Sequence, residues 1–238
     1  MIAHRSWKQV LPWVTAFAIA MAFLESAVVI YLRKLYYPDD FHFPLAPIDQ
    51  RIAITELLRE VATMIMLLAP GAMITRSRLE RFAWFAFCFG VWDIFYYVFL
   101  KAILGWPTSI LDWDVLFLVP VVWVGPVLAP IIVSIGLTIL AFIILRKRSA
   151  DPVFALARSH GFALGLCSCI MLFTFVEEPC RYLIARGGNS KQFTVSDPAA
   201  ATLTQLAGYV PVHFSWPVFT FACAIGTAAM IGIARRRK

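Results

Sequence analysis

The chain has 238 residues, of which 61% are hydrophobic and 15% are charged, and its mean hydropathy is +0.78. Soluble globular domains are close to half apolar and a quarter charged, so this composition excludes a protein built mainly from soluble domains. The formal net charge of +7 is explained by basic residues that flank membrane spans, and we expect no nucleic-acid partner.

Apolar runs of about 20 residues recur along the sequence, and a helix of that length crosses a hydrocarbon core of about 30 Å. In lipid, only helices and closed barrels satisfy their own backbone hydrogen bonds, and these runs lack the alternation of a barrel strand. We therefore predict a single all-α integral membrane domain, a polytopic helical bundle in the lipid bilayer. Its six transmembrane helices are expected to form three hairpins over residues 10–34, 51–74, 82–104, 126–146, 160–185 and 212–234.

Charge is distributed asymmetrically around these spans. Basic residues gather at one set of span ends, and the positive-inside rule then places both termini in the cytoplasm, as expected for a protein of the inner (plasma) membrane. All acidic residues except Glu80 and Asp151 lie at or beyond the middle of the spans, toward the other side. Because burying a carboxylate in hydrocarbon is costly, we expect these acids to line an acidic intramembrane chamber that faces outward.

The first span carries Glu25, and its pattern of an acid followed eight residues later by a cation recurs in the third and fifth spans. The three pairs are Glu25 with Arg33, Asp93 with Lys101, and Glu178 with Arg186. We interpret the pattern as a weak parallel repeat, of the kind that some transporters show. Coincidence is the alternative, because a cation at the rim is expected on any such helix.

The second span begins with ITELLREVAT, in which Glu56, Glu60 and Thr63 share one helical face because positions three and four apart are neighbours. Arg59 lies beside that face, within reach of Glu56. The pattern predicts an ion network with one negative charge in excess. This excess negative charge would be neutralised by a proton, a metal ion, a ligand cation or Arg181 from across the bundle. A structural salt bridge that locks two helices is the alternative interpretation.

The third span carries Asp93 near its middle, with Tyr97 one turn away on the same face. An isolated aspartate at this depth is a candidate proton carrier. The alternative is a neutral acid that is hydrogen-bonded to a tyrosine or threonine of a neighbouring helix.

Residues 107–125 are too short in apolar length for a full span, and Pro120 would break a helix there. We predict an outer-surface or re-entrant segment. Asp112 and Asp114 would lie on one side of it if it is extended, either guarding the chamber mouth or lying in a solvated loop. A similar Pro-broken stretch opens the sixth span, where Pro211 and Pro217 surround His213.

Glu177 and Glu178 end the fifth span on the outer side, followed by Pro179 and Arg181. Glutamates from several helices together with a histidine are a possible ligand set for one divalent metal, such as Zn²⁺, Mn²⁺ or Ca²⁺. The predicted metal ligands are His213, Glu60, Asp93 and Glu177. A di-iron site is not expected, because the E-x-x-H pairs of such sites do not occur in this sequence.

No nucleophile or phosphate-binding motif is present, so the sequence assigns no reaction. The acidic chamber favours a small cation- or proton-coupled transporter. One alternative is a membrane-embedded enzyme acting on a lipid, quinone or isoprenoid at the outer leaflet; another is an accessory subunit of an oligomer or larger membrane complex. The candidate ligand- or proton-binding residues are Glu25, Glu56, Arg59, Glu60, Asp93, Tyr97, Glu177, Glu178 and Arg181.

Overall fold

A computed structural model describes residues 6–38, 40–119, 121–187 and 208–236. The described residues form six helices and one two-stranded antiparallel sheet. In chain order the elements are α1 (Trp7–Tyr36), α2 (Gln50–Ile74), α3 (Arg78–Leu104), β1 (Trp113–Phe117), β2 (Trp123–Pro126), α4 (Leu128–Ala150), α5 (Arg158–Gly187) and α7 (Trp216–Arg235).

Each predicted span overlaps one of these helices, and the spans predicted at 126–146 and 212–234 begin before α4 and α7 do. Local sequence signals explain where the helices begin and end. The largest difference is at α7, which begins at Trp216 instead of residue 212. Pro217 then lies in the first turn, where its missing N–H leaves no hydrogen bond unmade. α3 ends at Gly105, whose φ of 72° is the left-handed conformation that glycine adopts without strain.

Five helices of the described chain are long and apolar enough to cross a membrane: α1, α3, α4, α5 and α7. α2 is also long but carries four charged residues in its first half, Arg51, Glu56, Arg59 and Glu60. Its polar residues Glu56, Glu60 and Thr63 are buried, whereas its apolar residues Leu58 and Ile65 are each 63% exposed. This inverted pattern is typical of a helix that faces lipid on one side and a polar bundle interior on the other. The protein is therefore a multi-pass helical membrane protein.

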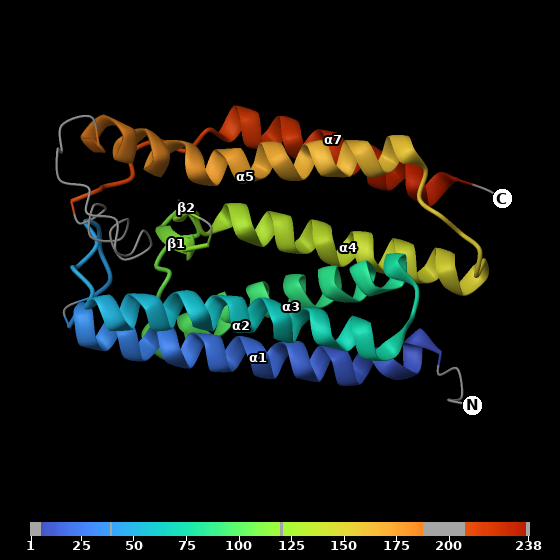
Figure 1. Cartoon of the computed structure of the whole chain (residues 1–238), viewed down its shortest axis with the longest axis horizontal. Coiled ribbons are helices and arrows are strands. Elements are labelled where there is room, and N and C mark those ends of the chain that lie inside the picture. The colour runs from blue at the N-terminus through green and yellow to red at the C-terminus, as the bar shows by residue number, and fades with distance from the viewer. Residues whose placement is uncertain (1–5, 39, 120, 188–207, 237–238) are drawn as a thin grey trace.

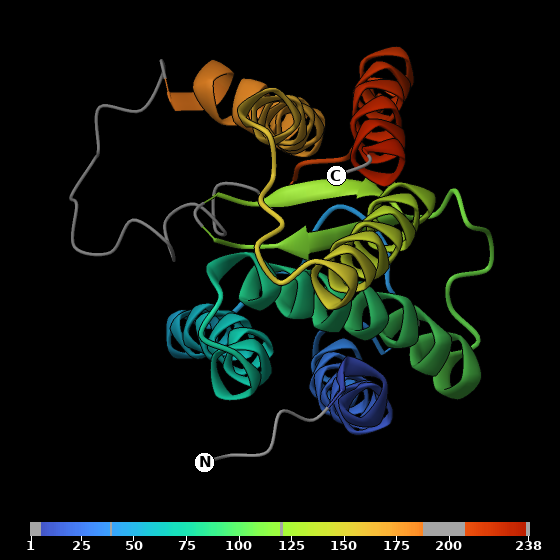
Figure 2. The ribbon, with the colours of Figure 1, turned by 90° about the vertical axis from the view of Figure 1, so that its right-hand side faces the viewer.

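The helices run nearly parallel to one long axis and form two groups. α3 packs against α1, α2 and α4, and α5 packs mainly against α7. Figures 1 and 2 show α1, α2 and α3 on one side, α5 and α7 on the other, and α4 with the β1–β2 hairpin between them. The start of α1 and the end of α7 lie at the same end, here called the terminal end; the opposite end is called the hairpin end (Figure 1).

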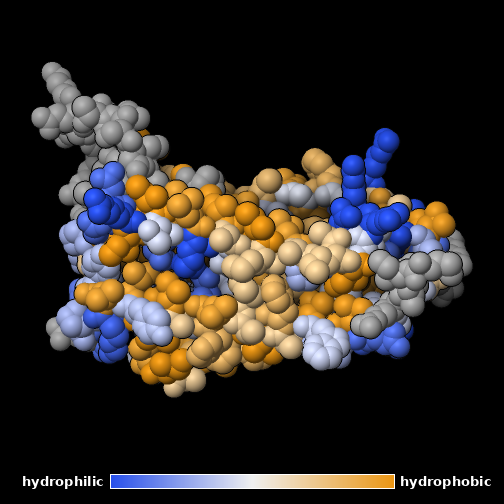
Figure 3. Space-filling model, turned by 60° about the horizontal axis from the view of Figure 1, so that its bottom comes forward, coloured by the Kyte–Doolittle hydropathy of each residue, from blue (hydrophilic) through white to orange (hydrophobic). Residues whose placement is uncertain are grey.

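Hydrophobic side chains cover the middle of the molecule, as a membrane requires. In Figure 3 they form a broad band between hydrophilic side chains at the two ends, and some hydrophilic surface also shows in a recess within the band. The largest buried cluster lies between α1, α3 and α4 and includes Trp84, Phe87 and Ile144. Two smaller clusters surround the hairpin, one around Val122 and Tyr209 and the other around Phe175 and Phe214.

The stretch predicted as an outer-surface or re-entrant segment folds as the β1–β2 hairpin. Asp114 pairs with Gly125 and Val115 with Val124, and a bulge follows Val115. A Cβ added to Gly125 would lie 2.9 Å from the Phe175 ring of α5, so glycine is required for the strand to approach that helix. The hairpin adds a small sheet to a bundle that was predicted to be all-helical.

The packing does not establish the predicted arrangement of three equivalent hairpins. α3 makes extensive contacts with both α1 and α4, whereas α1 and α2 have few contacts. The acids of the proposed repeat also differ in their partners: Glu25 contacts an arginine, Asp93 a serine, and Glu178 a tyrosine and backbone N–H groups. The side chain of Arg186 lies outside the described residues.

Candidate functional site

Arg59 connects two helices near the middle of the hairpin-end half. Its Nε donates to Glu56 Oε2 at 2.8 Å on the same helix, and its Nη1 pairs with Glu25 Oε1 of α1. Thr63 Oγ1 donates to the other oxygen of Glu25 at 3.1 Å. The predicted pair of Glu56 and Arg59 is therefore present, and Glu25 completes the network. Two carboxylates against one guanidinium leave one negative charge in excess when all three groups are ionised.

Glu60 follows on the same helix but bonds to a different element. Both of its carboxyl oxygens accept a hydrogen bond from the backbone N–H of Leu118, at 3.1 and 2.9 Å. Glu60 is buried and forms no ion pair with any other described residue. α2 thus anchors the tip of the hairpin through a carboxyl group that has a neutral partner.

Arg33 on α1 anchors the start of strand β1, through Asp114. Its Nη2 donates to Asp114 Oδ1 at 3.0 Å, and the Tyr97 hydroxyl donates to Asp114 Oδ2 at 3.2 Å. The guanidinium also lies over the rings of Trp106 and Phe41, at 3.8 and 4.3 Å from their centroids. Asp114 and Arg33 are both buried, so the ion pair is shielded from water and compensated on several sides.

Asp93 lies in the middle of α3 and faces α4. Its Oδ2 accepts a hydrogen bond from Ser134 Oγ at 2.7 Å, and both residues are buried. Tyr97 is one turn further along the helix, but its hydroxyl points to Asp114. Among the described residues, Asp93 has no cationic partner. One of the two predictions for Asp93 included a hydroxyl partner on a neighbouring helix, and the hydroxyl in the structure is that of a serine in place of a tyrosine or threonine.

Asp112 and Asp114 do not act as a pair, contrary to the expectation for an extended segment. Asp112 precedes β1 and caps a turn, where slight burial is outweighed by hydrogen bonds from Ser109 and Thr108 that lower the pKa of its carboxyl. Burial raises the pKa of Asp114, against the opposing effect of the Arg33 guanidinium. The strand begins between the two residues, so one stays near solvent and the other enters the bundle.

Glu177 and Glu178 both hold the segment that leads into α7. Glu178 accepts hydrogen bonds from the Tyr209 hydroxyl at 2.9 Å and from the backbone N–H groups of Val212 and His213 at 2.9 and 3.1 Å. Burial, followed by the nearby Glu178 charge, raises the pKa of Tyr209. The role of this glutamate is therefore to fix the backbone that carries His213.

Arg181 lies at the surface and pairs with its own helix. Its Nη2 is 2.7 Å from Glu177 Oε1, and its side chain is 76% exposed. The other oxygen of Glu177 accepts a hydrogen bond from Ser215 Oγ at 3.0 Å. Arg181 therefore pairs with Glu177, whereas the sequence had left it as a possible partner for the acids of α2.

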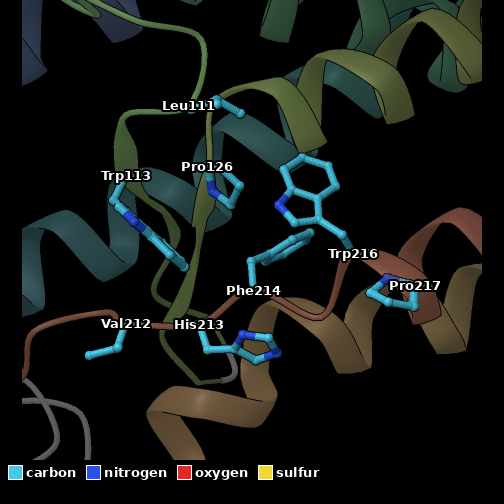
Figure 4. A pocket seen from close by; sticks show the side chains of 8 residues that line it. All are labelled: Leu111, Trp113, Pro126, Val212, His213, Phe214, Trp216 and Pro217. Carbon is cyan, nitrogen blue, oxygen red and sulfur yellow. The ribbon is translucent and has the colours of Figure 1, made fainter.

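A cavity of about 340 Å³ lies beside this segment, between the hairpin and the start of α7. Figure 4 shows its lining, which includes Trp113, Phe214, Trp216 and His213. A second, smaller cavity of about 20 Å³ is lined by Arg33 and Trp106 among others. None of the acids predicted as site residues lines either cavity, so these two cavities do not correspond to the expected acidic chamber.

The four predicted metal ligands do not come together. No group of three or more His, Cys, Asp or Glu residues in the described part of the chain is arranged to hold a metal ion. Glu60 faces the hairpin tip, Asp93 faces α4, and Glu177 bonds to Ser215. The backbone of His213 is held by Glu178. These residues do not fit a shared metal centre, and we derive no chemistry from one.

Three residues that complete the site were not among the candidate ligand- or proton-binding residues predicted from the sequence: Arg33, Asp114 and Ser134. Asp114 and Arg33 are 81 positions apart, and Ser134 is 41 positions from Asp93. Of these residues, only Asp114 could have been selected from the sequence, because an acid inside a short apolar run needs a buried partner. The other two could not, because an arginine at a span end and a serine in a span are both common.

The site falls into three parts around the hairpin: the α1–α2 ion network with Glu60, the Arg33–Asp114 pair with Tyr97, and the Asp93–Ser134 pair. The α5 glutamates support the opposite side of the hairpin end. Compared with known proteins, the chain matches no family model, no curated protein and no solved structure.

Proposed function

We propose that this membrane protein is a small proton- or cation-coupled carrier in which Asp93 and Glu60 bind the coupling proton. The observation that carries the proposal is that both carboxyls are buried, at 7% exposure each, with neutral hydrogen-bond partners. Ionisable side chains inside membrane spans are costly, and they commonly mark proton or ion paths.

A series of polar groups leads from Asp93 toward the hairpin end. Tyr97 is the next polar side chain on that face of α3, and its hydroxyl bonds to Asp114, which in turn pairs with Arg33. Hydroxyl and carboxyl groups of this kind can pass protons by rotating and re-forming hydrogen bonds. The series supports a path that opens at the hairpin end.

In this proposal the protein lies in the inner (plasma) membrane with both termini in the cytoplasm, so that the path opens to the outside. The distribution of basic residues in the sequence supports this orientation through the positive-inside rule.

Proton movement in proteoliposomes tests the proposal. The purified protein is reconstituted with a pH-sensitive dye inside, and outward or inward gradients of Na⁺, K⁺, Mg²⁺, Ca²⁺ or tetramethylammonium are imposed in turn. We expect at least one gradient to drive proton flux, and Asp93→Asn to reduce that flux at least tenfold, because an amide cannot release a proton at neutral pH.

Asp112→Asn is the matched control, since it makes the same chemical change at a carboxyl that lies near solvent in a turn. Its flux should equal that of the unmodified protein. The carrier function is contradicted if none of the five cations moves protons, or if Asp93→Asn transports at the unmodified rate.

Two alternatives stay as predictions with less support. A lipid-, quinone- or isoprenoid-directed enzyme needs an acid and a base beside its substrate, and the glutamates nearest the larger cavity bond to Ser215, Arg181 and backbone N–H groups instead. An accessory subunit needs buried charges that pair with a neighbour, whereas Glu25, Glu56 and Asp114 pair within the chain.

A further inference from the structure

The cavity beside α7 has features of a built site that the proposed carrier path does not use. It lies between the hairpin and the start of α7, and its walls come from distant parts of the chain. Leu111, Trp113 and Pro126 form one side, and Val212, His213, Phe214, Trp216 and Pro217 form the other. Figure 4 shows the rings of Trp113, Phe214 and Trp216 around it. Its volume of about 340 Å³ is at the lower end of the range for small-molecule sites.

The wall that carries His213 is held in place by α5. Glu178 accepts hydrogen bonds from the backbone N–H groups of Val212 and His213. Glu177 accepts a hydrogen bond from the hydroxyl of Ser215. These bonds use the backbone and leave the His213 imidazole unused, since that ring makes no hydrogen bond or ion pair with the described residues. The segment is therefore fixed while its imidazole stays available to a ligand.

The lining offers hydrogen-bond donors and aromatic faces but no full charge. Trp113 and Trp216 can each donate one indole N–H, and a neutral His213 can donate one ring N–H. The cavity lining includes no Asp, Glu, Lys or Arg. A phosphate or carboxylate ligand would need cations, and a metal would need further ligands. The chemistry fits a neutral, flat molecule with acceptor oxygens.

Exposed apolar side chains stand at the rim of the cavity. Val212 is 82% exposed and Leu111 is 56% exposed, and Trp216 begins a membrane span. Large apolar residues at the mouth of a cavity at this depth favour entry from the lipid, where a water-soluble ligand would be scarce. The ligand is therefore expected to be membrane-soluble.

We infer that this cavity binds the head group of a membrane quinone, a neutral ring with two carbonyl oxygens. Trp113 and Trp216 both contact the Phe214 ring, at 6.4 and 4.8 Å between centroids, and so form one aromatic wall. The quinone ring packs against this wall, as aromatic pairs do at about 4.5–7 Å between centroids. A carbonyl oxygen of the quinone accepts a hydrogen bond from the imidazole N–H of His213. The isoprenoid or alkyl tail extends between Leu111 and Val212 into the lipid. The inference concerns binding alone and does not depend on the proposed carrier function.

Equilibrium binding of a decyl-substituted benzoquinone to the protein in lipid nanodiscs tests this inference. Quinone bound in excess of protein-free nanodiscs is expected to saturate at one molecule per chain. His213→Phe keeps a ring of similar size but removes the donor, and we expect it to raise the Kd about tenfold, the effect of losing roughly one hydrogen bond. Filling the cavity with Leu111→Trp should abolish the saturable component.

His42→Phe is the matched control, because His42 is also exposed but lies outside the cavity lining; its Kd should be unchanged. Excess binding that never saturates, or that is equal in His213→Phe and the unmodified protein, overturns the inference. If decanol displaces the bound quinone as effectively as unlabelled quinone does, the cavity binds an acyl chain. If an anionic phospholipid displaces it, the cavity binds a head-group phosphate. Either result overturns the quinone assignment. A failure of proton flux leaves this binding test unaffected.

Discussion

Arg33 illustrates how a charged residue is accommodated inside a membrane protein. It pairs with Asp114 at 3.0 Å and lies over the rings of Trp106 and Phe41, so ionic and cation–π contacts share the cost of taking it out of water. Nη1 has no hydrogen-bond acceptor in the described part of the chain, which leaves the aromatic faces as its compensation. The pair joins α1 to the hairpin.

Breaking this pair on one side should destabilise the protein more than removing both charges. We expect Arg33→Met to lower the free energy of unfolding by about 3–5 kcal/mol, because it leaves a buried carboxylate without its cation. Adding Asp114→Asn to that variant should restore part of the loss. Thermal unfolding in detergent, followed by circular dichroism for both single variants and the double variant, measures the coupling. Strictly additive effects would show that the pair contributes no interaction energy.

The contacts that could be predicted at the residue scale are the local ones. Helical spacing indicated the pair of Glu56 and Arg59, which the structure contains. The bond of Asp93 to Ser134 could not be predicted, because it depends on how two helices rotate against each other. Spacing along one helix determines which side chains share a face, but it does not determine which residues of other helices that face contacts.

The β1–β2 hairpin connects the two helix groups, together with the direct contact between α4 and α7. β2 contacts both α4 and α5, while the β1 strand and the hairpin tip bond to α1, α2 and α3 through Asp114 and Leu118. Non-helical backbone inside a membrane protein is tolerated where surrounding protein satisfies its polar groups. The hairpin meets that condition through the hydrogen bonds between its two strands. In addition, the carboxyl of Glu60 accepts a hydrogen bond from the backbone N–H of Leu118.

Gly125 provides a test of how closely the hairpin packs against α5. Gly125→Ala would place a methyl group 2.9 Å from Phe175, and we expect a loss of about 1–3 kcal/mol in the free energy of unfolding from overpacking. Gly136→Ala is the control, since no atom lies within 4 Å of an added Cβ there, and it should be neutral or slightly stabilising in its helix. Equal unfolding temperatures for the two variants would refute the close approach.

Prolines and apolar length predicted that residues 107–125 are not a full span, and the structure agrees. The strands themselves could not be recognised, because the neighbouring residues Val124 and Gly125 of β2 are both buried and the sequence around them is apolar without alternation. Strands with both faces covered lack the alternation that identifies a half-buried strand. The six helices were easier to predict, because length and composition alone define a membrane helix.

At the scale of the whole molecule, the clusters of basic residues and most of the acids lie at different positions along the long axis. The terminal end holds Arg148, which pairs with Glu80 at 2.8 Å, and Lys147, which bonds to the backbone oxygen of Arg236. The buried acids Glu60, Asp93 and Asp114 lie in spans or at the hairpin end. The sequence predicted this separation from span ends alone, but it did not predict that the acids would be distributed among three separate contacts around a hairpin.

Labelling of introduced cysteines can determine which end faces outward. In a chain whose five cysteines are first replaced by serine or alanine, we expect Thr108→Cys at the hairpin end to react with a membrane-impermeant maleimide added to intact cells. Val153→Cys, in the exposed loop between α4 and α5 at the terminal end, should react only after the cells are opened. The reverse pattern would invert the orientation predicted by the positive-inside rule.

The charges of α2 also bear on how the protein is made. A segment with Glu56, Arg59 and Glu60 in close succession is a poor substrate for the translocon on its own, because each charge adds to the cost of entering lipid. α1 leaves the ribosome first and carries Glu25, the partner of Arg59. Glu25 is therefore already in the bilayer when Arg59 enters it, and membrane insertion of α2 is expected to be less efficient when Glu25 is missing.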